Sequence, residues 1–180
     1  MAIKFIPVIE EQMSVGFTGK VNILSPFNHQ FLGFLLFKDG QVINTKYQNK
    51  EGLRAFYHLG IREHCLDKHQ YIVEPEIVNE DEKRIHFPFT VLKSKLDQQI
   101  KIAEEVQKFR PPQHLRIVVD PRIISKDFEC TPEEFKVLGT LTEWNKVEDI
   151  YEHCSLLEHE ITNALVILRK KGALKIIGVK

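Results

Sequence analysis

The chain has 180 residues, of which 43% are apolar and 28% are charged, so it can bury one sizeable core or two modest ones. Lysines and arginines number 25 against 25 acidic residues, which excludes a strong overall field drawing the protein onto DNA or an anionic membrane. The start lacks the apolar stretch of a signal peptide, no run approaches the roughly eighteen apolar residues that cross a bilayer, and the cysteines are widely spaced. We therefore expect a soluble cytoplasmic protein with reduced thiols and no membrane insertion.

The first part of the chain has the pattern of a small antiparallel sheet. Segments rich in β-branched and aromatic residues predict strands over residues 15–24, 31–37 and 41–47. Between the last two segments, Asp39 and Gly40 supply the positive φ angles of a two-residue hairpin turn. This turn would place Phe37 opposite Val42.

A helix and a further strand follow the hairpin. Residues 50–59 place apolar side chains at near-helical spacing, and Gly60 is expected to end this helix. Residues 71–78 predict a strand, and Pro75 within it favours a sheet edge because proline cannot donate a ladder hydrogen bond. Residues 1–90 are therefore expected to form a small α+β domain.

Residues 91–109 predict an amphipathic helix, because apolar side chains recur at helical spacing. The stripe consists of Leu92, Leu96, Ile100, Ala103 and Val106. Either a partner helix in a homodimer or the chain's own N-terminal sheet would cover this stripe, and the sequence leaves both open. Pro111 and Pro112 end the helix, and residues 115–124 are expected to be a linker or an edge strand. Residues 91–130 are thus interpreted as a connecting helix and linker.

Residues 131–180 carry repeated helix-start signals. Thr131 and Glu134 have the spacing of a capping box, and Pro132 occupies the first helical position. The same logic predicts helix starts at Asn145 with Glu148 and at Ser155 with Glu158. The expected core positions of the helices are Phe135, Leu138 and Leu141, then Val147, Ile150 and Tyr151, then Leu157, Ile161, Ala164, Leu165 and Leu168.

The end of the chain completes the pattern of a winged-helix-like domain over residues 131–180. Gly172 is expected to end the last helix, and residues 174–179 predict a strand. The resulting order of helix, helix, helix and strand is that of a winged helix.

Clusters of potential metal ligands and nucleophiles do not form a known site. The clusters are His64, Cys65, Asp67 and His69, and His153, Cys154 and His159. Neither spacing matches a zinc finger or a helical His-Glu-x-x-His arrangement. Neither a serine nucleophile elbow nor a catalytic cysteine signature occurs, and glycine-rich phosphate loops are also missing from the sequence. We expect no metal, no cofactor and no enzymatic activity.

The last helix decides between two functional classes. Its outward face is expected to carry Glu158, His159, Thr162, Asn163, Val166, Arg169 and Lys170, with Lys171 beside them. Glu158 and Glu160 occupy the N-terminal half of the helix, where base readout usually takes place, and their charge opposes phosphate contact. DNA binding is therefore the alternative, and it would use Asn163, Arg169, Lys170 and Lys171.

A family resemblance covers roughly residues 14–78. It rests on the motifs Gly19-Lys-Val-Asn-Ile, Gly33-Phe-Leu-Leu-Phe-Lys-Asp-Gly-Gln-Val-Ile and Glu51-Gly-Leu-Arg-Ala-Phe. These motifs resemble the PATAN domain of bacterial signalling proteins, in which a strand, an aspartate-glycine turn, a strand and a helix follow one another. The resemblance implies that Gly19, Asp39, Gly40 and Gly52 are turn and packing residues. It also implies a role in two-component, motility or polarity systems, exerted by protein contact.

These observations predict an α+β protein that acts as a non-enzymatic bacterial signalling adaptor. The expected partner is another protein, such as a response regulator or a small GTPase. Aromatic residues and arginine dominate the hot spots of protein interfaces. The candidate interface residues are Phe27, Phe31, Tyr47, Arg54 and Tyr57. The alternative is a winged-helix transcription regulator that binds DNA.

Overall fold

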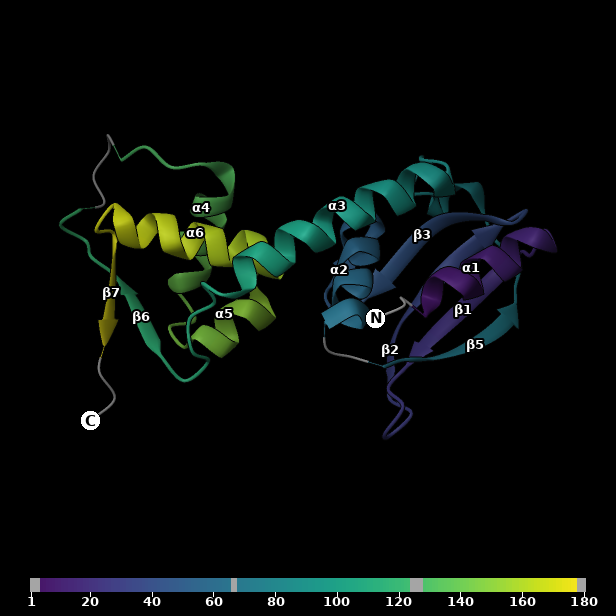
Figure 1. Cartoon of the computed structure of the whole chain (residues 1–180), viewed down its shortest axis with the longest axis horizontal. Helices are drawn as coiled ribbons and strands as arrows, with labels where there is room; N and C mark the ends of the chain where they lie inside the picture. Colours follow the sequence, from purple (N-terminus) through teal and green to yellow (C-terminus); the bar gives the residue numbers. More distant parts are fainter. Residues whose placement is uncertain (1–3, 66–67, 124–127, 178–180) are drawn as a thin grey trace. The chain divides into compact units, whose positions relative to one another are not determined.

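The structure, a computed structural model, describes residues 4–65, 68–123 and 128–177 (Figure 1). It divides into two compact units, Met1–Lys101 and Ile102–Lys180. The predicted α+β class is confirmed, because each unit combines helices with antiparallel strands. The boundary falls inside a helix, so the expected connecting segment 91–130 is divided between the units instead of standing between them.

The first unit is built around an antiparallel sheet. In chain order it contains α1 (Phe5–Ser14), β1 (Gly19–Leu24), β2 (Phe31–Lys38), β3 (Gln41–Tyr47), β4 (Lys50–Glu51), α2 (Gly52–Cys65), β5 (Gln70–Pro75), the 3₁₀ turn η1 (Glu80–Glu82) and α3 (Phe89–Gln107). The strand order is β4-β3-β2-β1-β5, so β5 lies at an edge, as Pro75 predicted. In the part of the chain that the structure describes, no helix has the length and apolar character needed to span a bilayer.

The β2–β3 hairpin forms as the sequence predicts. Asp39 and Gly40 have φ angles of 49° and 74°, and Phe37 lies opposite Val42. The first strand begins at Gly19 and not at Val15, because the backbone N–H of Phe17 still donates to the carbonyl of Gln12 in the turn that ends α1. Local turn chemistry therefore fixes this part of the sheet.

Gly60 has a role that its sequence context did not suggest. It was expected to end the helix, but α2 continues to Cys65 and Gly60 is buried within it. A Cβ atom at Gly60 would lie 2.5 Å from Cδ1 of Leu96 on α3. The glycine thus permits a close approach of α3, and the apolar stripe that includes Leu92 and Leu96 is buried. Within the first unit, this stripe packs at Leu96 against the chain's own α2.

The second unit has the order strand, helix, helix, helix and strand. Its elements are β6 (Arg116–Val119), α4 (Pro132–Leu141), α5 (Val147–His153), α6 (Glu158–Lys170) and β7 (Leu174–Ile177). β6 and β7 lie side by side as an antiparallel pair, with Ile117 opposite Ile176 (Figure 1). Residues 116–119 are therefore a strand of this unit and not a linker. The predicted residues 178 and 179 of the last strand lie outside the described residues.

The helix starts of the second unit differ from the sequence prediction in two of their caps. The Thr131–Glu134 capping box is confirmed, since the Glu134 N–H donates to Thr131 Oγ1 at 3.3 Å. Lys146 precedes α5 in place of Asn145, and Leu157 precedes α6 in place of Ser155. Glu160 satisfies the start of α6 by accepting from the Leu157 N–H at 2.8 Å. A side-chain pattern alone does not reveal which backbone N–H a carboxylate reaches.

One predicted core residue of the second unit lies on its surface. Phe135 is 69% exposed, whereas Val137, two positions along α4, is fully buried. The buried face of α4 consists of Glu134, Val137 and Leu141. It is therefore rotated away from the stripe of Phe135, Leu138 and Leu141 that the sequence suggested, although Leu138 remains partly buried against the core.

Candidate functional site

The residues expected to bind a partner separate into exposed and buried groups. Phe27 is 94% exposed and Phe31 is 56% exposed, while Arg54 is half-buried. Tyr47 and Tyr57 are buried, so these two expectations are corrected: both side chains belong to the core of the first unit. Tyr47 ends β3 with its ring turned inward, and Tyr57 lies on α2 with its ring 6.2 Å from that of Phe56.

Phe27 is presented by an ordered connection between β1 and β2. The Ser25 N–H donates to the Gln30 carbonyl at 2.9 Å, and the His29 N–H donates to the Ser25 carbonyl at 3.0 Å. His29 adopts a φ of 54° and its Nδ1 lies 3.0 Å from Oε1 of Gln70 on β5. The Ser25–Gln30 bond closes the connection at its base and His29 links it to β5, so Phe27 is presented on an ordered connection.

Phe31 belongs to an apolar patch on one face of the sheet. Asn22 pairs with Phe34 on one side and with Ile72 on the other, and after a register shift in the β1–β2 pair Leu24 lies opposite Phe31. Paired residues in antiparallel strands share a face, and Asn22 and Leu24, two positions apart, share it too. We call Leu24, Phe31, Phe34 and Ile72 the outer patch. Farther along the sheet, Val78 packs against Leu36 and Ile43 and covers them, whereas it does not cover Phe31.

A cavity of about 420 Å³ opens at the foot of the Phe27 connection. Its lining consists of Ser25, Pro26, Phe27, Gln30, Leu32, Tyr47, Gln48, Arg62, Lys68 and His69. The lining includes the cations of Arg62 and Lys68, and among the described residues that form it there is no aspartate or glutamate. The lining is mixed, because Phe27, Leu32 and Tyr47 lie beside these two cations.

The floor of this cavity is a buried hydrogen-bond network. The Tyr47 hydroxyl lies 2.9 Å from Nε2 of His69, and Nδ1 of His69 lies 3.2 Å from Oε1 of Glu63. The Tyr71 hydroxyl donates to the same carboxylate, and the Phe5 N–H donates to its other oxygen at 3.0 Å. Glu63 thereby joins α1, α2, the segment that leads into β5, and β5 itself.

The network has the chemistry of a structural support. Because a carboxylate accepts, His69 Nδ1 donates to Glu63, and Nε2 of the same ring is the atom that contacts the Tyr47 hydroxyl. A chain of carboxylate, imidazole and hydroxyl can activate a nucleophile when the hydroxyl reaches a substrate. Here the Tyr47 side chain is fully buried and its hydroxyl is bonded to His69. Burial and the adjacent Glu63 carboxylate raise the pKa of Tyr71, which keeps that hydroxyl protonated.

Sequence reasoning missed Glu63 and Tyr71, and it considered His69 only as a metal ligand. Glu63 lies on α2, His69 in the segment before β5 and Tyr71 on β5, and no short motif joins them. The only available signals were the low frequency of buried carboxylates and a helix that continues beyond Gly60. Across the ranges that the structure describes, no group of three or more His, Cys, Asp or Glu side chains converges as metal ligands. Asp67, one of the considered ligands, lies outside those ranges.

The residues of the DNA-binding alternative lie on α6 and just beyond it. Asn163, Arg169 and Lys170 are exposed, whereas Lys171 forms an ion pair with Glu134 at 2.7 Å. His159 and Thr162, expected on the outward face, are buried, and the Thr162 hydroxyl lies 2.5 Å from that of Tyr151. The exposed surface of α6 is therefore narrower than the helical pattern suggested.

Comparison with known proteins identified no relative of this chain. No family model, curated protein or solved structure matches this chain.

Proposed function

We propose that this protein is a non-enzymatic signalling adaptor that binds another protein through the first unit. The resemblance of residues 14–78 to the PATAN domain supports this role and favours a bacterial two-component, motility or polarity pathway in the cytoplasm. A response regulator or a small GTPase would be a partner of the expected kind.

The exposure of Phe27 carries the proposal. Burying a phenylalanine side chain gives about 1.5–3 kcal/mol, and Phe27 forgoes nearly all of this while ordered bonds hold its connection outward. Phe31 and the outer patch extend the apolar surface, and the cationic cavity lies at the foot of the same connection. An apolar anchor beside a charged rim is the usual anatomy of a protein interface.

The test is affinity capture from the source cell with the full chain, followed by binding measurements with each captured protein after purification. Phe27→Ala and Phe31→Ala should each weaken binding about tenfold or more, because truncation of a hot-spot aromatic costs at least about 1–2 kcal/mol. Their melting temperatures should stay within a few degrees of the parent, since surface changes cost under about 0.5 kcal/mol.

Phe135→Ala provides the matched control, since Phe135 is also an exposed phenylalanine but lies on α4 of the second unit. It should leave partner binding unchanged. Equal loss of binding in this control, or full binding by Phe27→Ala, would contradict the proposed interface. Turnover of a metabolite by the purified chain would contradict the adaptor role itself.

The second candidate function is DNA binding by the second unit, and it rests on the exposure of Asn163, Arg169 and Lys170 on α6. In a DNA complex, affinity would fall steeply with salt as counterions are released. The adaptor contact should be much less sensitive to salt, so a salt titration separates the two functions.

A further inference from the structure

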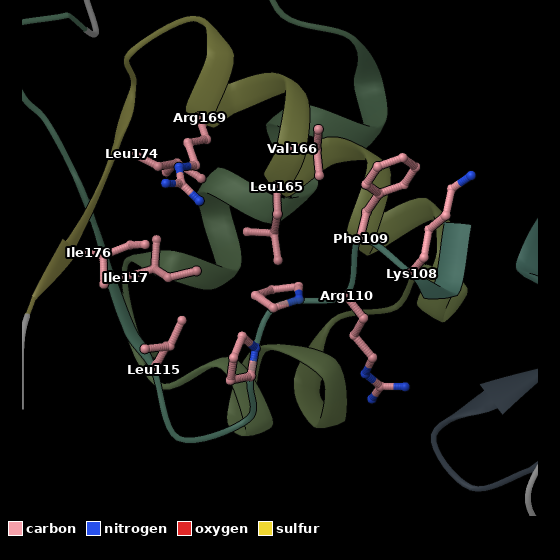
Figure 2. A pocket seen from close by; sticks show the side chains of 12 residues that line it. Lys108, Phe109, Arg110, Leu115, Ile117, Leu165, Val166, Arg169, Leu174 and Ile176 are labelled. Carbon is pink, nitrogen blue, oxygen red and sulfur yellow. The ribbon is translucent and has the colours of Figure 1, made fainter. Parts of the chain in front are cut away.

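A hollow of about 250 Å³ lies within the second unit beside α6 (Figure 2). Its lining consists of Lys108, Phe109, Arg110, Pro111, Pro112, Leu115, Ile117, Leu165, Val166, Arg169, Leu174 and Ile176. We call it the α6 groove. Its aliphatic side chains come from β6, α6 and β7 and the residues that flank them, so the groove is built on the ordered elements of the unit and not on a loop alone.

The charge around the α6 groove is of one sign. Among the described residues that line it there are cations but no carboxylate. Arg110 is already engaged, because it forms an ion pair with Glu158 and its guanidinium lies 4.3 Å from the centre of the Tyr151 ring. Arg169 is exposed and, within the described part of the chain, forms no ion pair.

Figure 2 distinguishes the two remaining cations. The guanidinium of Arg169 turns toward the apolar side chains of the groove, whereas the amine of Lys108 points away from them. A guanidinium can donate two parallel hydrogen bonds to a carboxylate. The groove therefore offers an apolar floor with one available carboxylate-binding group at its edge.

We propose that the α6 groove binds a small organic acid with an apolar body, of the class of medium-chain carboxylic acids. The apolar part of the ligand is buried against the aliphatic side chains of the groove, and Arg169 pairs with the ligand's carboxylate. The volume lies just below the roughly 300–1,000 Å³ of pockets for drug-sized ligands, so a compact ligand fits. A helix, about 10–12 Å across with its side chains, is too large. The charged side chains that line the groove are all cationic, so a ligand with a protonated amine would be repelled.

The probe is octanoate, titrated into the full chain by calorimetry and by NMR of the leucine and isoleucine methyl groups. Saturable one-to-one binding is expected, with shifts concentrated at Leu115, Ile117 and Leu174. Hexanoate should bind roughly tenfold more weakly, because it lacks two methylenes. 1-Octanol has the same body without the carboxylate and should also bind about tenfold more weakly or worse.

Variants on α6 assign the charge contact. Arg169→Gln should weaken octanoate binding about tenfold or more and leave 1-octanol binding unchanged. Lys170→Gln, at an exposed neighbouring cation outside the groove lining, should change neither. The proposal is overturned by absence of saturable octanoate binding, by equal affinity for 1-octanol, or by an equal loss in Lys170→Gln. Displacement of bound octanoate by duplex DNA would also overturn it, because nucleic acid would then be the occupant.

Discussion

Buried tyrosines set how this protein responds to alkaline pH. Burial, with the nearby Glu63 carboxylate, raises the pKa of Tyr71 above its ordinary value of 10.0, and burial raises the pKa of Tyr151 to about 12. Above pH 10 the unfolded chain loses these phenolic protons while the folded chain keeps them. Stability is therefore fully present below about pH 10 and should fall at higher pH, by up to about 1.4 kcal/mol per pH unit for each tyrosine.

Tyr71→Phe tests this dependence. At pH 8 the variant should lose about 1–3 kcal/mol, because Glu63 loses a buried donor. Between pH 10 and 11.5 its free energy of unfolding should decline less steeply than that of the parent, since one tyrosine no longer titrates. Urea unfolding followed by circular dichroism across this range measures both effects. An unchanged slope above pH 10 would show that Tyr71 is not protected from ionisation.

Asp120 sets the response to acid in the second unit. Hydrogen bonds from Arg122 and Lys175 lower the pKa of Asp120 well below its ordinary value of 3.8. This contribution to stability is present above about pH 4 and is lost as the pH falls, since the unfolded chain takes up the proton first. Asp120→Asn should therefore flatten the decline of the melting temperature below pH 4.

At the scale of elements, the contact between α2 and α3 depends on one missing side chain. Gly60→Ala would gain about 0.5–1 kcal/mol of helix propensity but would place a Cβ atom 2.5 Å from Leu96, which is fully buried. Overpacking of a well-packed core costs about 1–3 kcal/mol, so we expect net destabilisation in urea unfolding. Combination with Leu96→Ala, which makes room, should cost less than the sum of the single changes.

Gly139→Ala is the matched control for this helix argument. Gly139 is exposed on α4, and a Cβ atom there would meet no atom within 4 Å. The change should stabilise the protein by about 0.5 kcal/mol or slightly more. Destabilisation by Gly139→Ala would contradict the expected gain in helix propensity. Stabilisation by Gly60→Ala would contradict the expected overpacking against Leu96.

Elements governed by local chemistry could be predicted from the sequence, and elements governed by tertiary contact could not. The Asp39-Gly40 turn and the Thr131 capping box depend on neighbours within a few residues, so their patterns predicted them correctly. Gly60 was misinterpreted because the reason for a glycine lies on α3, far along the chain. Phe135 was misplaced because either of two adjacent faces of α4 could have been buried.

The candidate site was predictable only in part for the same reason. Phe27 and Phe31 were recognisable as aromatic residues at a strand connection, and both are exposed. Tyr47 met the same criteria, but its strand position turns it toward His69 in the core. The charge that surrounds a cavity, as with Arg62 and Lys68, depends on segments that meet only after folding.

The charge of the whole molecule bears on nucleic acid. Cationic and acidic residues balance at 25 each, and Lys171 is held by Glu134. We therefore expect no gel shift with random duplex DNA at physiological salt, because non-specific affinity comes from phosphate neutralisation. Micromolar binding that disappears in an Arg169→Ala/Lys170→Ala variant would contradict this and would favour a transcription regulator.

The strand order β4-β3-β2-β1-β5 has a consequence for assembly of the first unit. Strands β1, β2 and β3 each pair with the next strand in sequence, whereas β5 returns from beyond α2 to pair with β1, with Gly19 opposite Pro75. Contacts between segments that are distant in sequence form later during folding, because closing the longer loop costs more conformational entropy. Tyr71 lies on β5, so the Glu63 network and the floor of the cavity are completed only when β5 docks. Amide exchange should therefore be faster in β5 than in β2 and β3, and a chain with β5 undocked would present Phe27 without the rigid base that orients it.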